Sequence, residues 1–271
     1  MKKALCDREP SVMAAALNLY LAEAKENPRK YRELASSFVI ILKQVIEHKL
    51  PKEFDYHRLP APWIQMKLLE LLEILGKGDL KASEHCYTIL EQALKRSEDG
   101  SNNIAFAVCY QCVKTISNIY PNENLIQDAA SSLKRFLESQ NSNIKYMGIR
   151  GLSHIYKQYP QLLEDYQLVI VDCLESKDET LKRETLELLY KMTNNKNIEV
   201  IVSKMLNTLH SSTDSYFRNT LVLKITALAE RYAPSHEWYI DTMCLLFELG
   251  SEYLNEQILN NFLKLVVENC E

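Results

Sequence analysis

Hydrophobic residues in this chain recur in helix-sized blocks that follow one another in the same order. Within each block the apolar positions are three and four residues apart, which is the periodicity of one face of an α-helix. The blocks that open each repeat begin near Val12, Ile64, Ile104, Ile144, Leu181, Phe217 and Leu254. Apart from a longer first interval, this recurrence of about 36 to 40 residues predicts helix pairs that stack side by side.

Helix breakers lie in step with these blocks. Proline lacks an amide hydrogen and clashes with the preceding turn, so it ends a helix. The breakers that fall about 16 or 17 residues after a block begins are Pro28, Pro121, Pro160 and Pro234. Gly76, Gly78 and the asparagines at 194, 195 and 197 occupy nearly the same phase in other blocks. We therefore expect a corner at each point, followed by the second helix of the pair.

The fourth and fifth pairs show the expected interior most clearly. In the second helix of the fourth pair, the residues expected to face the interior are Leu162, Leu163, Tyr166, Val169, Ile170 and Leu174. In the fifth pair Leu188 belongs to the inward stripe, whereas Glu187 faces outward. Gly148 and Gly151 lie inside one helix, where each costs about 1 kcal/mol relative to alanine. We expect the close approach of a neighbouring helix to compensate for that cost.

One stretch, from Lys49 to Pro62, interrupts the pattern. It carries three prolines together with Phe54, Tyr56 and His57. A loop of this length inside an array is often functional or packed on itself, and we expect it to lie along the surface of the stack. Neither the first nor the last helix has a capping unit outside it, although a solenoid needs a polar outer face at each end. The chain is therefore interpreted as a segment that is incomplete at both ends.

These patterns together predict the fold class. We expect an all-α fold, a right-handed alpha-alpha superhelix of the HEAT or armadillo kind, with about thirteen helices. Residues 1–271 are expected to form a single solenoid of helical repeats.

Composition narrows the function classes. The net charge of -4 and the pI near 5.9 give no support for nucleic-acid binding, which usually shows a basic surface. No apolar run approaches the roughly 18 residues that span a membrane, and the start of the chain lacks the apolar core of a signal peptide. The seven cysteines are odd in number and most lie in helical patterns, which favours reduced thiols in a cytosolic protein.

Candidate catalytic and metal-binding residues do not form a recognisable motif. Cys109 and Cys112 form a Cys-x-x-Cys in mid-helix, without the second pair or the histidines that a zinc site requires; we interpret them as core cysteines. The histidines are scattered at 48, 57, 85, 154, 210 and 236. No phosphate loop, nucleophile elbow or general acid/base pair stands out. We expect no enzyme activity, no cofactor and no metal.

Basic doublets and tryptophans are the remaining candidates for a binding surface. The doublets are Lys2-Lys3, Lys95-Arg96, Lys134-Arg135 and Lys182-Arg183. They would suit a phosphoinositide or a GTPase if they converged in space, but ordinary exposed helix positions balanced by glutamates are the simpler interpretation. Trp63 and Trp238 each open a helix and are interpreted as core anchors. The partner-binding residues themselves are unknown from sequence.

Three runs carry a family resemblance. Tyr-His-Arg-Leu-Pro-Ala-Pro-Trp-Ile-Gln at 56–65, Leu-Lys-Arg-Glu-Thr-Leu-Glu-Leu-Leu-Tyr at 181–190 and Ala-Glu-Arg-Tyr-Ala-Pro at 229–234 resemble the trunk of the large adaptor subunits of vesicle coats. The resemblance extends over essentially the whole chain. Pro-Ala-Pro-Trp is shared by the alpha and epsilon types. The Tyr-His ahead of it and the run at 182–190 look most like the epsilon type, which occurs in adaptor protein complex 4.

The resemblance implies a structural subunit of a heterotetrameric coat adaptor that sorts cargo in protein transport. Its implied partners are a small sigma subunit, a beta-type large subunit, a mu subunit and an Arf-family GTPase. Its implied location is peripheral, on trans-Golgi network and endosomal membranes, in a complex that works without clathrin. Relative to the family the chain is short, and the first trunk helices, the hinge and the appendage are expected to be missing.

Other functions stay open on the sequence alone. One is the trunk of an alpha- or gamma-type subunit in clathrin-mediated traffic. A second is an unrelated HEAT-repeat scaffold of the nuclear-transport or phosphatase-regulatory kind. A third is a lipid-binding module that uses the basic doublets.

Overall fold

Helices account for most of the chain in the computed structural model, which describes residues 2–5, 7, 9–98 and 102–269. Over these residues there is no strand, and a single isolated bridge joins Tyr56 to Leu59. The helices fall into two compact units, Met1–Leu162 and Leu163–Glu271. The all-α prediction and the helical-repeat architecture are confirmed, whereas the single solenoid over 1–271 and its handedness stay predictions.

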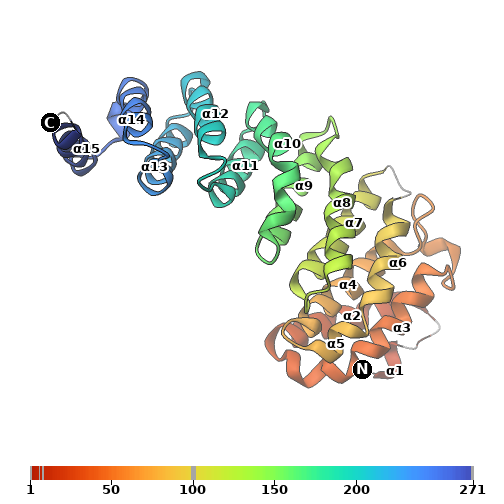
Figure 1. Ribbon diagram of the computed structural model, residues 1–271. Helices are drawn as coiled ribbons and strands as arrows, with labels where there is room; N and C mark the ends of the chain where they lie inside the picture. The colour runs from red at the N-terminus through yellow and green to blue at the C-terminus, as the bar shows by residue number, and fades with distance from the viewer. Residues whose placement is uncertain (1, 6, 8, 99–101, 270–271) are drawn as a thin grey trace. The chain divides into compact units, whose positions relative to one another are not determined.

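Unit 1 is built of two helix layers (Figure 1). One layer contains the first helices of the pairs, which contact one another in chain order: α2 (Pro10–Glu26), α4 (Pro62–Gly76), α7 (Asn103–Asn118) and α9 (Ser142–Tyr156). The other contains the second helices α3 (Ala35–Ile46), α6 (Tyr87–Glu98) and α8 (Glu123–Leu137). The short helix α1 (Lys2–Leu5) precedes α2, and the connections include α5 (Leu80–Glu84) and the 3-10 segments Pro28–Leu34 and Lys52–Phe54.

Unit 2 repeats the same plan. Its first helices are α11 (Glu179–Met192), α13 (Ser215–Tyr232) and α15 (Glu256–Asn269). Its second helices are α10 (Gln167–Asp172), α12 (Ile198–Ser211) and α14 (His236–Gly250), and Figure 1 shows these three along one side of the unit. 3-10 turns Pro160–Tyr166 and Cys173–Glu175 flank α10, and Ser251–Tyr253 follows α14.

The hydrophobic register predicted from the sequence is confirmed. Six of the seven predicted starts fall in the first turn of a first helix, from α2 to α13, and Leu254 lies two residues before α15 begins at Glu256. Among the described residues, thirteen α-helices have six residues or more, which agrees with the expected number. The stripes fill the space between the layers: Leu188 in unit 2 and Leu152 in unit 1 are 0% exposed. Full burial of such a side chain contributes about 1.5–3 kcal/mol.

Corners and caps also follow the sequence. Pro28, Pro121 and Pro234 lie two or three residues after the helices that end at Glu26, Asn118 and Tyr232. Side-chain oxygens accept hydrogen bonds from free amides at several starts, and Asp214 does so for the N–H groups of Tyr216 (2.9 Å) and Phe217 (3.3 Å). Such a cap stabilises a helix by about 1 kcal/mol.

Gly148 and Gly151 allow α9 to lie close against α8. A Cβ atom at Gly148 would lie 2.9 Å from Cβ of Phe136, and one at Gly151 would lie 2.8 Å from both methyl carbons of Leu133. The packing explanation for these helical glycines is confirmed.

The second helix of the fourth pair differs from the prediction. Instead of one helix across 162–174, a six-residue α10 is held between two 3-10 turns. Leu163, Ile170 and Leu174 are buried as expected, but Val169 is 41% exposed, and its inward assignment was wrong. A 3-10 turn has three residues per turn rather than 3.6. The face that points inward therefore changes phase where α10 begins.

Trp63 is the second correction, because it is 53% exposed rather than a core anchor. The preceding loop sets this orientation: Ala61 has a φ of 38°, and Gln65 Nε2 donates to the carbonyl of Pro60 at 2.6 Å. The ring of Trp63 lies 6.3 Å from that of Tyr56, which is also exposed. The loop thus lies at the surface, as predicted. Trp238 is half-buried at the start of α14.

Candidate partner-binding surfaces

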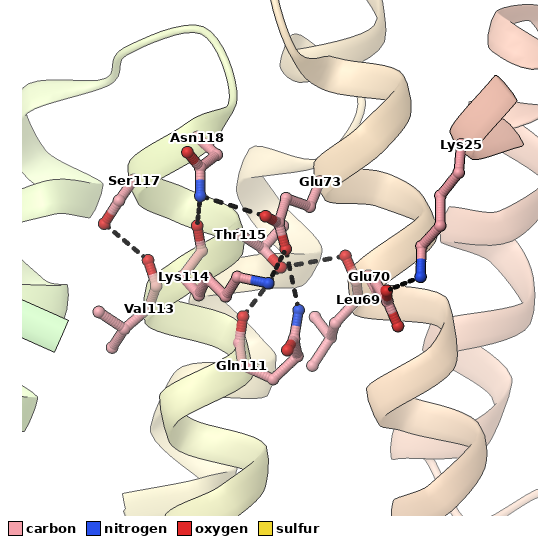
Figure 2. Close-up of polar contacts among 10 residues, drawn as sticks. All are labelled: Lys25, Leu69, Glu70, Glu73, Gln111, Val113, Lys114, Thr115, Ser117 and Asn118. Carbon is pink, nitrogen blue, oxygen red and sulfur yellow. Dashed lines mark hydrogen bonds and ion pairs between the residues drawn. The ribbon is translucent and has the colours of Figure 1, made fainter. Parts of the chain in front are cut away.

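A polar seam joins α4 to α7 in the first-helix layer of unit 1. We define the α4–α7 seam as Glu73, Gln111, Lys114 and Asn118. Figure 2 shows the carboxylate of Glu73 pointing at the three α7 side chains. It accepts hydrogen bonds from Gln111 Nε2 at 3.1 Å and Asn118 Nδ2 at 3.2 Å, and Lys114 Nζ lies 3.3 Å away.

The helical repeat explains why these residues meet. Gln111, Lys114 and Asn118 are three and four residues apart, so they share the edge of α7 that faces α4. Thr115 Oγ1, on the same edge, donates to the carbonyl of Leu69 at 3.0 Å, and Lys25 on α2 pairs with Glu70 at 2.8 Å. Glu73 is 14% exposed and its oxygens are engaged by three donors. This carboxylate therefore ties helices together and is not a free general acid or base.

Arginines tie the second-helix layer of unit 1 together. Arg96 on α6 donates to the carbonyl of Ile46, the last residue of α3, at 2.9 Å. Arg135 on α8 donates to the carbonyls of Ser97 and Glu98, at the end of α6, at 2.9 and 2.8 Å. A cation at a helix C-terminus satisfies unpaired carbonyls and interacts favourably with the helix dipole.

The basic doublets are thus more than ordinary exposed positions. In two of them the arginine caps the preceding helix while the lysine is exposed. In the third, Arg183 pairs with Asp214 at 2.6 Å and Lys182 with Glu179 at 2.8 Å. Lys2 falls at a position whose side chain is outside the described residues, and Lys3 is exposed. Because most of these cations have internal partners, the doublets give little support to a lipid-binding module.

The second-helix layer of unit 2 exposes aliphatic side chains instead. Leu168 on α10 is 71% exposed and Val200 on α12 is 52% exposed. Val169 and Leu245, on α10 and α14, are exposed as well. Between α10 and α12 lies an open hollow of about 520 Å³ lined by Leu168, Val171, Asp172, Glu199, Val200, Ser203 and Lys204. We call this hollow the α10–α12 groove.

A signal in the sequence could have revealed this groove. The inward stripe of α12 needs Ile198, Ile201, Val202 and Met205, so Val200 is a surplus aliphatic residue. Leu168 next to Val169 is a similar surplus on α10. Aliphatic residues in excess of those that the inward stripe requires therefore predict an exposed apolar surface on both α10 and α12.

The paired cysteine candidates lie in the core, apart from these surfaces. Cys109 Sγ donates to Ser132 Oγ at 3.8 Å, and Cys112 Sγ to the carbonyl of Leu90 at 3.4 Å. Burial raises the pKa of Cys112 well above its usual value and that of Cys86 to about 12, so these two thiols stay protonated. The core interpretation is confirmed. All five cysteines among the described residues are free thiols, while Cys6 and Cys270 lie outside that part of the chain.

The described part of the chain offers neither a metal site nor a membrane-spanning helix. There, no group of three His, Cys, Asp or Glu side chains is arranged to hold a metal ion. No described helix combines the length and the apolar character needed to cross a membrane.

Known proteins resemble this chain along its whole length. The family model of the adaptin N-terminal region matches residues 1–271. The human protein named AP-4 complex subunit epsilon-1 is 46% identical over 270 residues, which covers 100% of this chain and 24% of the human protein. The Arabidopsis thaliana AP-4 complex subunit epsilon is 43% identical over 98% of this chain and 28% of its own length. The AP-1 complex subunit gamma of Dictyostelium discoideum is 29% identical over 100% of this chain and 30% of its own. The chain thus spans about a quarter of the length of the first two relatives.

Proposed function

This chain belongs to the family of the adaptin N-terminal region, and from that premise we propose that it forms part of the trunk of a large subunit in a vesicle-coat adaptor complex. The observation that carries the proposal is the 46% identity to an AP-4 epsilon subunit over 270 residues, against 29% for an AP-1 gamma subunit. The difference supports the epsilon type over the gamma type. It gives no support to a nuclear-transport or phosphatase scaffold.

The physical role that we propose is structural rather than catalytic. Several polar side chains of unit 1 resemble candidate catalytic groups in the sequence. In the structure they hold helices together. Glu73 binds three donors from α7, and Arg96 and Arg135 cap neighbouring helices. Layers held in this way support a rigid frame for partner subunits, since repeat stacks offer extended binding surfaces.

The partners and location follow the same proposal. We propose a small sigma subunit, a beta-type large subunit and a mu subunit as partners within a heterotetramer, and an Arf-family GTPase as the membrane recruiter. The complex would act peripherally on trans-Golgi network and endosomal membranes, in cargo sorting without clathrin. No nucleic acid, cofactor or metal enters this function.

Co-expression tests the assignment directly. The tagged chain is co-expressed with an epsilon-class sigma subunit and, in parallel, with a gamma-class sigma subunit, and recovery of each is measured at matched expression. We expect the epsilon-class sigma subunit to co-purify in preference. Recovery of neither above a tag-only control, or preference for the gamma-class subunit, would overturn the epsilon assignment.

A further inference from the structure

The α10–α12 groove has a floor and walls of aliphatic side chains. Val171 is buried at its base, whereas Leu168 and Val200 stand exposed on its two sides. The groove is open to solvent and has a volume of about 520 Å³. Exposed aliphatic residues that line a common hollow mark interaction sites more often than residues scattered singly over a surface.

The local structure explains the hollow. α10 has only six residues, with 3-10 turns before and after it, so it is about 9 Å long at 1.5 Å per residue. α8, the second helix of the preceding pair, has 15 residues. The hollow lies beside this short helix, and the surplus residues Leu168 of α10 and Val200 of α12 both line it.

The rim of the groove is acidic. Asp172 lies at the end of α10 and Glu199 in the first turn of α12, and neither makes an ion pair with another described residue. The cation that lines the groove, Lys204, is paired with Glu175, which is the main cause that raises the pKa of Lys204, and Asp172 adds a weaker electrostatic contribution from beyond ion-pair distance. An occupant with positive groups at its edges would therefore find two carboxylates without an ion-pair partner.

The α6–α8 surface of unit 1 lacks these features, whereas α3 exposes one aliphatic residue, Ile40. The exposed residues of α6 and α8 are all polar, for example Gln92 on α6 and Gln127 and Asp128 on α8. The aliphatic groove is therefore not a general consequence of this repeat. It is particular to the α10 and α12 positions.

We propose that the α10–α12 groove binds an amphipathic helix of a partner protein, with branched aliphatic residues on one face and lysine or arginine at the edges of that face. A channel between two helices with an apolar floor fits a third helix, whose ridges pack into it. The acidic rim selects the basic edges and disfavours an anionic membrane surface. The proposal rests on unit 2 alone and does not depend on the adaptor assignment.

Two labelled peptides test the proposal by fluorescence anisotropy with the whole chain. Both are amphipathic helices with the same leucine and isoleucine face, and one has lysines at its edges where the other has glutamates. We expect the lysine peptide to bind about ten-fold more tightly. The Leu168→Ser/Val200→Ser double variant should weaken that binding by about ten-fold, because two aliphatic contacts are lost. The Asp172→Lys/Glu199→Lys variant should reverse the preference between the peptides.

The matched control is Leu223→Ser, on α13, which removes an exposed leucine outside the groove and should leave lysine-peptide binding unchanged. Unchanged binding in the Leu168→Ser/Val200→Ser variant, or an unchanged preference in the charge variant, would overturn the proposal. So would phosphatidylserine vesicle binding, or concentration-dependent dimerisation of the chain, that the Leu168→Ser/Val200→Ser variant abolishes. These outcomes would assign the groove to a membrane or to a second copy.

Discussion

The second helices α6 and α8 of unit 1 and α10 and α12 of unit 2 occupy the same place in the repeat but present opposite chemistry to their outer side. α6 and α8 are polar outside and are joined by Arg135, which reaches the end of α6. α10 and α12 expose Leu168 and Val200 above an apolar hollow. The comparison teaches that the repeat dictates only the inward stripe, and that the outward positions are free to carry either internal cross-links or a binding surface.

One position in the repeat shows how an internal cross-link of unit 1 is replaced by a different residue in unit 2. Arg96 and Arg135 are 39 residues apart, and the residue a further 39 along is Leu174. The two arginines cap neighbouring helices, whereas Leu174 is 1% exposed in the interior of unit 2. A cap in one unit is thus replaced by a core side chain in the other.

The largest expected effect separates core from surface within unit 2. Leu188→Asp would bury a charge without a partner and should lower the free energy of unfolding by about 4 kcal/mol or more. Leu168→Asp, at a side chain that is 71% exposed, should change it by less than about 0.5 kcal/mol. Denaturant unfolding followed by circular dichroism measures both. Equal losses for the two variants would show that Leu168 belongs to the core and that the groove is not a free surface.

A second prediction concerns the arginine cross-link of unit 1. Arg135→Ala removes the hydrogen bonds to Ser97 and Glu98 and the contact of the guanidinium with the ring of Phe106, 4.8 Å away. The expected loss of unfolding free energy is about 1–3 kcal/mol. The chain has two tryptophans, Trp63 in unit 1 and Trp238 in unit 2. The Trp238→Phe background therefore reports unit 1 by fluorescence.

The matched control for that prediction is Lys134→Ala, at the exposed neighbour of Arg135, which should cost less than about 0.5 kcal/mol. If the two alanine variants were equally stable, the arginine cap would contribute nothing and the contrast between the two helix layers would lose its energetic basis.

The inward stripes were predictable because they depend on local periodicity. Inward-facing residues such as Leu188 recur every three or four positions, because each must contact the neighbouring helix. That spacing is visible directly in the sequence. Val169 could not be placed in the same way, because a 3-10 turn changes the phase without an obvious breaker beyond Pro160. The prediction that Trp63 is a core anchor was wrong for a similar reason. The backbone at Ala61, with a φ of 38°, sets the direction of the Trp63 side chain.

The binding surfaces were harder to predict than the stripes. The carbonyls that Arg96 and Arg135 cap lie 50 and 37 or 38 residues away, so the doublets could not be told from exposed lysine and arginine pairs. Glu73 likewise finds its donors 38 to 45 residues along the chain. Such pairings depend on which helix edges face each other, and the hydrophobic period does not specify edges.

A third prediction asks whether the units also differ in their first-helix layers. In unit 2 Glu187 on α11 lies 3.0 Å from Lys224 on α13, much as Glu73 meets Lys114 in unit 1. Glu187→Lys should cost about 0.5–1 kcal/mol, since it replaces an attraction by a repulsion in a partly exposed pair. The exchange Glu187→Lys/Lys224→Glu should restore part of the loss. Additive costs in this double-mutant cycle would show that the cross-link is specific to unit 1 and would widen the contrast between the units.

A fourth prediction is a pH dependence confined to unit 1, which centres on His154 of α9. Burial is the largest cause that lowers the pKa of His154 from 6.5 to about 4, and the nearby cations Lys157, Lys114 and Arg150 add to it. The unfolded chain therefore binds a proton between these two values that the folded chain does not. Stability should be complete above about pH 6.5 and should fall as the pH drops from there towards 4.

Single-tryptophan backgrounds locate this pH effect. Urea unfolding at about pH 7 and about pH 5 should show a loss of stability in the Trp238→Phe background, where Trp63 reports unit 1. The loss should disappear when His154→Gln is added, because glutamine stays neutral at both pH values. In the Trp63→Phe background the same His154→Gln change should leave the pH response of Trp238 unaltered. A pH response of unit 1 that persists without His154 would move its origin to another group, and an altered response at Trp238 would mean that the two units do not unfold independently.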